Sequence, residues 1–363
     1  LGQEFSGYQS QIEDCINRKN EVILNEDQII RSNWLNNKET YPDLPPISLV
    51  ETNGISNIKG KIYPLGHISN VYSVFGNEEC QSNQDDWIVN QMDEYGFNNP
   101  LGSHTNKNID LVILGDSFGE GYGVKSNYNI GSILRKKNHK VINFSKGGNG
   151  PLLQYATLNE YVTNYSPKKV FWFYYVNDIT DLLIELNSET LNNYLNNNEF
   201  TQNLINRQNE IDLSIRKYFQ SKIDNILKSD PNINSDAAQL KIATKTVETI
   251  IINEDEQSKK SQKIDSNQEV KDSINSRFIK YITKNNFYYI KFMLKLTNLR
   301  VILDLNSNTD YALMIFKNIL SNSKKIINEM GAEMYFVYLP AIGEYRNYKD
   351  KFQEDIFEVV NSL

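Results

Sequence analysis

The chain has 363 residues, a formal net charge of −7 and a pI of about 5.3. This acidic balance argues against a nucleic acid or an anionic membrane surface as the partner, because both attract basic proteins. The length is sufficient to bury a sizeable core in one large domain or two modest ones. No apolar run reaches the roughly 18 residues of a membrane span.

The cysteines and the chain ends carry limited information. Cys15 and Cys80 fit no metal-binding spacing, and the sequence leaves both two free thiols and one disulfide open. The chain begins at Leu1 without a methionine and ends at Leu363 within a helical pattern. We therefore expect a signal or membrane anchor to be missing in front and further sequence to be missing behind.

Residues 1–108 are expected to form an irregular N-terminal segment with some strands. A short helix is predicted around Glu26 to Asn36, followed by a proline-rich turn at Pro42 to Pro46. The stretch from Gly60 to Pro100 is rich in Gly, Tyr, Val and Asn, which predicts strands and loops packed beside a main sheet.

The clearest pattern lies in residues 109–175, where apolar segments of strand length alternate with helical ones. The predicted strands are Ile109–Leu114, Val141–Phe144 and Val170–Tyr175, and the predicted helices are Tyr128–Lys137 and Leu152–Tyr165. This alternation indicates right-handed crossovers and a parallel sheet. The aromatic residues of 171–175 are expected in the sheet core.

The remainder, within a second unit of residues 109–363, holds a predicted polar helical insertion at about 187–298. A helix is then predicted from Tyr311 to Met330, ending at Gly331 in the C′ position. Ala332–Leu339 is predicted as a fourth buried strand, closed by Pro340. A last helix from about Tyr348 should be followed by another strand, and its absence is the second reason to expect a truncated C-terminus.

Three polar features follow the predicted strands, at the sheet edge where parallel sheets place their ligands. Gly115-Asp116-Ser117 presents a hydroxyl on a tight turn, which can attack a carbonyl. The second feature is the segment 143–151, whose glycines expose backbone N–H groups that can line an oxyanion pocket. In the third, Asn177-Asp178, the amide can donate to the same oxyanion. The order and spacing of these three features are not expected to arise by chance.

This pattern resembles the SGNH (GDSL) hydrolase superfamily, named for four residues: Ser, Gly, Asn and His. Ser117 matches the nucleophile, Gly148 the glycine and Asn177 the oxyanion asparagine, with Gly147 and Gly150 as alternatives for the glycine. Asp116 and Asp178 are expected to brace the turns. The segment 93–100 is similar to one that precedes the nucleophile strand in members linked to cell-surface polysaccharide modification.

The resemblance implies a flavodoxin-like three-layer α/β/α sandwich with a parallel sheet, interrupted by the helical insertion. It further implies an O-acyl ester hydrolase or O-acetyltransferase that acts on a carbohydrate or small ester through a serine acyl-enzyme. No metal or organic cofactor is implied. We expect an extracytoplasmic location, with the insertion as a surface for a protein partner.

The sequence departs from the superfamily in lacking its last block, Asp-x-x-His, which would supply the general base. His67, His104 and His139 are the three histidines, and none has an Asp three residues before it. His104 and His139 precede strands and are expected at the wrong edge of the sheet. Either the block lies beyond Leu363, which we favour, or the domain is inactive and serves as a binding, accessory or structural subunit.

Other readings of the same residues are weaker. The glycines of 119–123 lack the spacing of a dinucleotide-binding loop, and a phosphate-binding loop would need Gly where Val124 stands. Asp178, Asp181 and Glu185 suggest a metal site, but Asp181 and Glu185 lie four residues apart and are predicted to form a solvated helix face.

Overall fold

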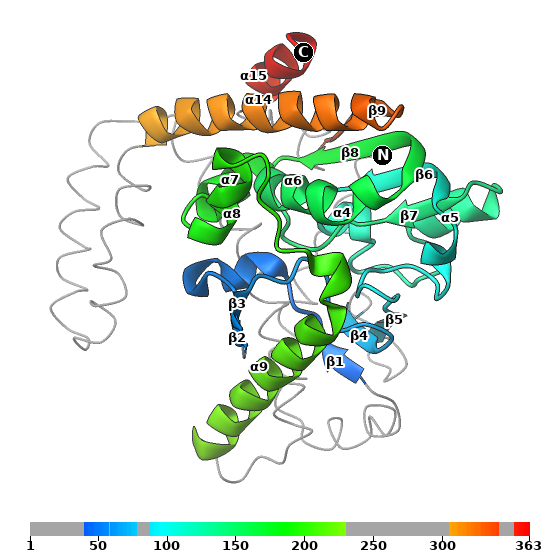
Figure 1. Cartoon of the computed structure of the whole chain (residues 1–363), viewed down its shortest axis with the longest axis vertical. Helices are drawn as coiled ribbons and strands as arrows, with labels where there is room; N and C mark the ends of the chain where they lie inside the picture. Colours follow the sequence, from blue (N-terminus) through cyan, green and yellow to red (C-terminus); the bar gives the residue numbers. More distant parts are fainter. Residues whose placement is uncertain (1–39, 58, 78–86, 230–304, 341–351) are drawn as a thin grey trace, which may run out of the picture.

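The structure is a computed structural model that describes residues 40–57, 59–77, 87–229, 305–340 and 352–363 (Figure 1). The helix predicted near Glu26, both cysteines and residues 230–304 of the predicted insertion lie outside the described residues.

The centre of the fold is a four-stranded parallel sheet with the order β7-β6-β8-β9. Its strands are β6 (Asn108–Leu114), β7 (Val141–Asn143), β8 (Ser166–Tyr175) and β9 (Glu333–Leu339). The apolar runs that predicted these strands are buried because neighbours cover both sides of β6 and β8. The predicted α/β class with a parallel sheet is therefore confirmed.

Helices cover the sheet unequally. The helices α6 (Pro151–Glu160), α7 (Asp178–Glu185) and α14 (Leu305–Glu329) contact one another, and α14 crosses the molecule above the sheet in Figure 1. They share one large apolar core with Val112, Leu114, Trp172 and Tyr174. Across the sheet, α5 (Ile130–Lys136) contacts β7, beside a small cluster of Leu111, Ile113, Val141 and Phe173.

The predicted helix ends are correct where a specific residue marks them. Gly331 follows α14 with a φ of 75°, a left-handed conformation that glycine adopts without strain. In contrast, α6 ends at Glu160, before its predicted end at Tyr165. The Asn164 side chain donates to the carbonyls of Glu160 and Tyr161, which replaces the next turn of helix with the 3-10 turn η4 (Val162–Asn164).

The prediction that the last strand is buried is wrong. In β9 no residue is fully buried, and Tyr335 is 40% exposed. Among the described strands, β9 pairs with β8 alone, so it is an edge strand of the sheet. An apolar sequence does not distinguish an edge strand from a central one, because both need an apolar face toward the core.

The N-terminal segment forms its own small sheets. β1 (Thr40–Pro42), β4 (Tyr72–Asn77) and β5 (Trp87–Gln91) make a three-stranded sheet, and β2 (Ile55–Asn57) pairs with β3 (Gly60–Ile62). Between β1 and β2 runs the 3-10 helix η1 (Pro46–Thr52). Leu49, Ile62 and Phe97 belong to the same apolar core as the parallel sheet, so the core is continuous across residue 108.

Residues 187–229 are also part of this core. They form α8 (Glu189–Asn196), the short η5 (Leu204–Asn206) and α9 (Gln208–Ser229), with Leu191, Tyr194, Ile211, Ile215 and Phe219 buried. α9 lies against the N-terminal segment, where Asp212 accepts hydrogen bonds from Ser69 and Glu210 pairs with Lys59. The final helix α15 (Gln353–Asn361) contacts α14. No helix in the described ranges is long and apolar enough to cross a membrane.

Candidate active site

The Gly-Asp-Ser turn joins β6 to the short helix α4 (Ser117–Glu120). Asp116 caps this helix, because its Oδ1 accepts a hydrogen bond from the Phe118 N–H at 3.0 Å. A Cβ on Gly119 would lie 2.3 Å from Ser145 Oγ, so only glycine allows the helix to approach the loop after β7 this closely. Ser117 is thus held in the first turn of α4, at the carboxyl edge of the sheet.

The glycine loop after β7 lies beside the serine. A Cβ on Gly147 would be 3.9 Å from Ser117 Cβ, which brings the first and second sequence features together. The Gly147 N–H donates to Glu120 Oε2 at 2.6 Å, so this N–H is already engaged. Gly148 has a φ of 72°, and none of the described residues accepts a hydrogen bond from its N–H. Of the two glycines, Gly148 is the one whose N–H is available to an oxyanion.

A buried ion cluster supports this loop. Lys146 Nζ donates to Glu120 Oε1 at 2.8 Å and to Asp43 Oδ1, and all three side chains are almost fully buried. Burial raises the pKa of Glu120 to about 8 against the opposing effect of Lys146. Burial alone would lower the pKa of Lys146, but Asp43 and Glu120 together raise it, so the lysine is charged. The cluster therefore ties the N-terminal segment, α4 and the glycine loop together.

Sequence reasoning missed this cluster. Lys146 lies within a glycine-rich loop that directly follows a buried strand. This position is the local signal from which burial of the lysine side chain could have been predicted. Its partner Asp43 is 103 positions away, and nothing in the sequence pairs them.

Asn177, the third feature, lies at the N-cap of α7. Its Nδ2 donates to Asp181 Oδ2 at 2.9 Å, which fixes the direction of the amide. Its Oδ1 is buried and accepts no hydrogen bond from the described residues. A hydrogen bond from this amide to an oxyanion would have to use its second N–H.

The solvated helix face predicted for Asp181 and Glu185 is wrong. Asp181 is 8% exposed and Glu185 is fully buried, and both lie against Gly150, where a Cβ would come 2.8 Å from Asp181 Cβ. Glu185 Oε2 accepts from the Leu152 N–H at 2.9 Å. Gly150 has no side chain to cap α6. The Glu185 carboxyl therefore accepts hydrogen bonds from the N–H groups at the start of that helix, which have no acceptor within the helix.

The carboxyls at this edge have raised pKa values, and burial is the main cause for each of them. Burial raises the pKa of Asp116 to about 6 and that of Glu185 to about 8. The pKa of Asp178 is raised well above its usual range, first by burial and then by Asp116, Asp181 and Glu185. At neutral pH, burial thus favours the protonated, uncharged form of Asp178 and of Glu185.

Several buried polar atoms at this edge have no hydrogen-bond partner among the described residues. They are Ser145 Oγ, both amide atoms of Asn149 and Asn177 Oδ1. Buried polar atoms in native proteins are nearly always paired with protein, water or ligand. These atoms are therefore open to pairing with water or with a polar group of a ligand.

The histidines lie elsewhere. His67 packs against Phe219 of α9, with ring centroids 5.9 Å apart. His104 belongs to the 3-10 turn η3 (Ser103–Thr105) before β6, and the exposed His139 precedes β7, so both occupy the amino-terminal side of the sheet as predicted. None of the three follows a strand of the parallel sheet.

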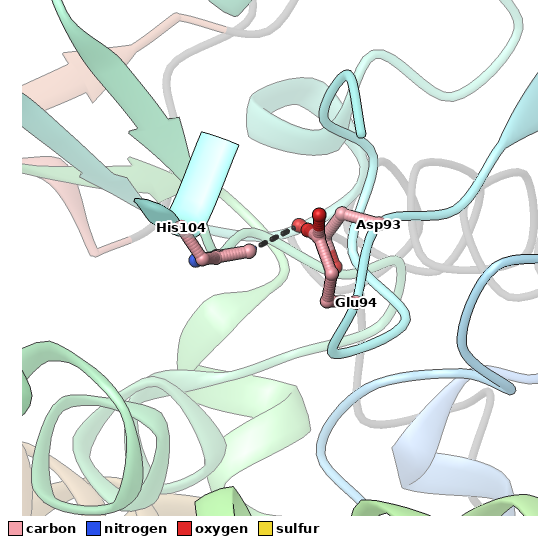
Figure 2. A group of neighbouring side chains, drawn as sticks. All are labelled: Asp93, Glu94 and His104. Carbon is pink, nitrogen blue, oxygen red and sulfur yellow. Dashed lines mark hydrogen bonds and ion pairs between the residues drawn. The ribbon is translucent and has the colours of Figure 1, made fainter. Parts of the chain in front are cut away.

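His104 instead is hydrogen-bonded to Asp93, and Glu94 lies beside this pair, as drawn in Figure 2. These are the side chains whose ligand atoms, all within 4.8 Å of one another, could in principle hold a metal ion. However, His104 Nε2 is hydrogen-bonded to Asp93 Oδ2 at 2.7 Å and its Nδ1 to the Tyr165 hydroxyl at 2.7 Å. The ring has no nitrogen left for a metal, so the cluster serves as a brace.

The same brace reaches the candidate site. Asp93 also accepts from the backbone N–H groups of Tyr95 and Phe97 and from Asn99 Nδ2. Asn99 Nδ2 also donates to the carbonyl of Asn143, the last residue of β7, and Asn98 Nδ2 to the carbonyl of Glu120. The segment 93–100 thus fixes the ends of β7 and α4 relative to each other.

A separate hollow of about 360 Å³ lies between α8 and α14. Asparagines line much of it: Asn192, Asn196, Asn318 and Asn322. None of the residues at the carboxyl edge of the sheet contributes to its wall.

Neither the known protein-family models nor the curated proteins give a match to this chain. The functional argument therefore depends on the residues and their geometry.

Proposed function

We propose that the protein is an SGNH-type O-acyl ester hydrolase or O-acetyltransferase that forms an acyl-enzyme on Ser117. The observation that carries the proposal is the meeting of Ser117 and Gly147 at the carboxyl edge of a parallel sheet. The spatial strand order is β7-β6-β8-β9. When these four strands are numbered by their order along the chain, this order reads 2-1-3-4, which supports a flavodoxin-like sandwich.

In this proposal Ser117 Oγ attacks the ester carbonyl and the ester C–O bond breaks. The serine proton ends on the oxygen of the leaving alcohol, and the acyl group stays on Ser117. The tetrahedral oxyanion would accept hydrogen bonds from the Gly148 N–H, the Asn177 amide and the Ser117 N–H. One such donor is typically worth about 3 kcal/mol of the barrier. Transfer of the acyl group to water gives a hydrolase, and transfer to a sugar hydroxyl gives an acetyltransferase.

The protonation of the buried carboxyls supports an anionic intermediate here. Charged carboxylates would repel the oxyanion, but burial raises the pKa of Asp178 well above its usual range and that of Glu185 to about 8, which favours the uncharged forms. As carboxylic acids they carry no charge and can donate a hydrogen bond. Asp116 and Asp178 keep the bracing role expected from the sequence.

The carbohydrate or small-ester substrate, the extracytoplasmic location and a protein partner for the insertion are part of the same proposal. They follow from the resemblance of the Ser117, Gly148 and Asn177 motifs to the superfamily. A second candidate is an SGNH-like domain that binds without reacting. The placement of the three histidines away from the strand ends favours it, because a serine without a base is a poor nucleophile.

One experiment separates the two candidates. The full-length protein is treated with a fluorophosphonate, which labels activated serines, and the modified residue is located by mass spectrometry; turnover of triacetin is measured in parallel. The hydrolase proposal predicts a label on Ser117 and turnover that Ser117→Ala abolishes. No label and no turnover would favour the binding domain, and turnover that survives Ser117→Ala would remove Ser117 as the nucleophile.

A further inference from the structure

An aromatic pair lies directly beside Ser117. Phe118, the next residue, is 45% exposed, and its ring lies 4.2 Å from that of Tyr175 between centroids, at an interplanar angle of 37°. Tyr175 ends β8 and is half-buried. The other aromatic side chains that end β8, those of Trp172, Phe173 and Tyr174, are buried in the sheet as predicted.

The position of this pair is set by the sheet. β6 and β8 are neighbouring parallel strands in which Leu114 pairs with Trp172. Phe118 therefore projects from the turn after one strand and Tyr175 from the end of the next. In sequence the pair is one residue from Ser117 and two residues from Asn177, so it adjoins both the proposed nucleophile and the proposed oxyanion donor.

The exposed ring has no evident structural task. The Asp116 cap and the close approach of Gly119 to Ser145 fix α4, and neither involves the Phe118 side chain. Leaving about half of a phenylalanine in water forgoes part of the roughly 1.5–3 kcal/mol that burial of such a side chain provides. Single exposed apolar residues are common on protein surfaces, but Phe118 contacts a second aromatic ring directly beside the proposed nucleophile, where a ligand can cover it.

We propose that Phe118 and Tyr175 form a subsite for the pyranose ring of an acylated carbohydrate, which rests on the proposed function of Ser117. An aromatic face is electron-rich and attracts groups with partial positive charge, such as the axial C–H groups of a sugar ring. The Phe118 ring is 45% exposed and the Tyr175 ring is partly exposed, so a sugar that rests on them keeps its hydroxyls hydrated on the opposite face. An acyl chain would need an enclosed apolar pocket, and a quaternary ammonium would need a cage of aromatic faces.

The test compares two esters that share the acyl group and the number of acetyl groups. Methyl tri-O-acetyl-xylopyranoside has a ring, and triacetin has none. Phe118→Leu should raise KM for the sugar ester about tenfold, as expected for loss of one stacking surface, and leave kcat/KM for triacetin nearly unchanged. Phe118→Tyr should restore KM. Tyr335→Leu is the matched control, because Tyr335 is 40% exposed and meets the ring of Phe171 edge to face within the sheet.

Acetylcholine gives the third arm. If Phe118→Leu impairs acetylcholine turnover and leaves the sugar ester unaffected, the pair is a cation site and the proposal is overturned. Equal effects on the sugar ester and triacetin, or no effect on either, would also overturn it.

A binding measurement makes the subsite independent of catalysis. Methyl tri-O-acetyl-xylopyranoside is titrated into Ser117→Ala, with and without Phe118→Leu, and the affinity is followed by NMR. Binding that Phe118→Leu weakens supports the subsite, even if the wild-type protein turns over no ester and the hydrolase proposal fails. If Phe118→Leu leaves the affinity unchanged, or if no binding is detected, the subsite proposal is overturned. The proposed role of Ser117 is then tested separately by triacetin turnover and the fluorophosphonate label.

Discussion

Ile47 Cγ2 lies 2.7 Å from the point that a Cβ atom on Gly148 would occupy. The N-terminal segment therefore forms one side of the glycine loop that we assign to the oxyanion. This contact and the φ of 72° both require glycine at position 148, for different reasons.

The two reasons can be separated by substitution. Gly123 has a φ of 75° with no atom within 4 Å of its Cβ position, so Gly123→Ala isolates the backbone strain, about 1–2 kcal/mol. Gly148→Ala should lower the free energy of unfolding by a further amount of about 1–3 kcal/mol, because the new methyl group overpacks against Ile47. Urea denaturation measures both, and Ile47→Ala should remove the difference. Equal losses in the two alanine variants would contradict the contact.

Lys146 should be much more important for stability than a surface lysine. Lys146→Met leaves Asp43 and Glu120 buried together without a cation, and loss of one partner from a buried ion pair typically costs about 3–5 kcal/mol. Lys59→Met, which removes an exposed partner of Glu210, should cost less than about 1 kcal/mol. Adding Glu120→Gln to Lys146→Met should recover part of the loss. Similar unfolding free energies for Lys146→Met and Lys59→Met would argue against the buried cluster.

The sequence was sufficient to predict the central sheet because its signal is local. Apolar runs of strand length, helices between them and Gly331 are all visible within a few residues. The order of the Ser117, Gly148 and Asn177 motifs then placed them at one edge, because parallel strands end on the same side. Whether Gly147 or Gly148 has the available N–H could not be decided, since the acceptor Glu120 lies 27 positions from Gly147.

The predictions that are wrong concern the burial of side chains. Burial depends on contacts with residues that are far away in the sequence. The i,i+4 spacing of Asp181 and Glu185 shows that they share a helix face, but not which way that face points. They face inward because the N-terminus of α6 lacks a capping side chain and needs the Glu185 carboxyl, 33 positions from Leu152. For β9 the error is the opposite one. Its apolar residues suggest a buried central strand, but β9 lies at an edge of the described sheet and is only partly buried.

The stability of the protein should depend on the protonation of Glu185. Its pKa of about 8 in the folded state exceeds the ordinary 4.5, because burial disfavours the charged form by more than the backbone hydrogen bonds to the start of α6 favour it. The folded state thus binds a proton that the unfolded state releases, so this group destabilises the fold progressively as the pH rises from about 5 to about 8. Glu185→Gln lacks this slope. Its urea midpoint, relative to wild type, should therefore be higher at about pH 8 than at about pH 5.

The exposed Glu199 gives the control for removal of one negative charge, as Glu199→Gln. A Glu185→Gln variant whose midpoint relative to wild type is the same at both pH values would show that the carboxyl is charged in the folded protein. The neutral edge that we invoke for the oxyanion would then lose its support.

The Asp93–His104 pair should be indifferent to metal ions. For a cation to bind, His104 Nε2 would have to leave Asp93 Oδ2, and Asp93 would lose the hydrogen bond that helps to hold the segment 93–100 against β7 and α4. We therefore expect neither EDTA nor added Zn²⁺ to change the melting temperature of the wild-type protein. Asp93→Asn should lower the unfolding free energy by about 2–3 kcal/mol, since an amide cannot accept all the hydrogen bonds that the carboxylate now accepts. Glu94→Gln, whose carboxyl accepts a single hydrogen bond from the Gly102 N–H, should cost less. A rise in melting temperature with Zn²⁺ that Asp93→Asn abolishes would instead make these residues a metal site, and the segment 93–100 would then be held by the ion.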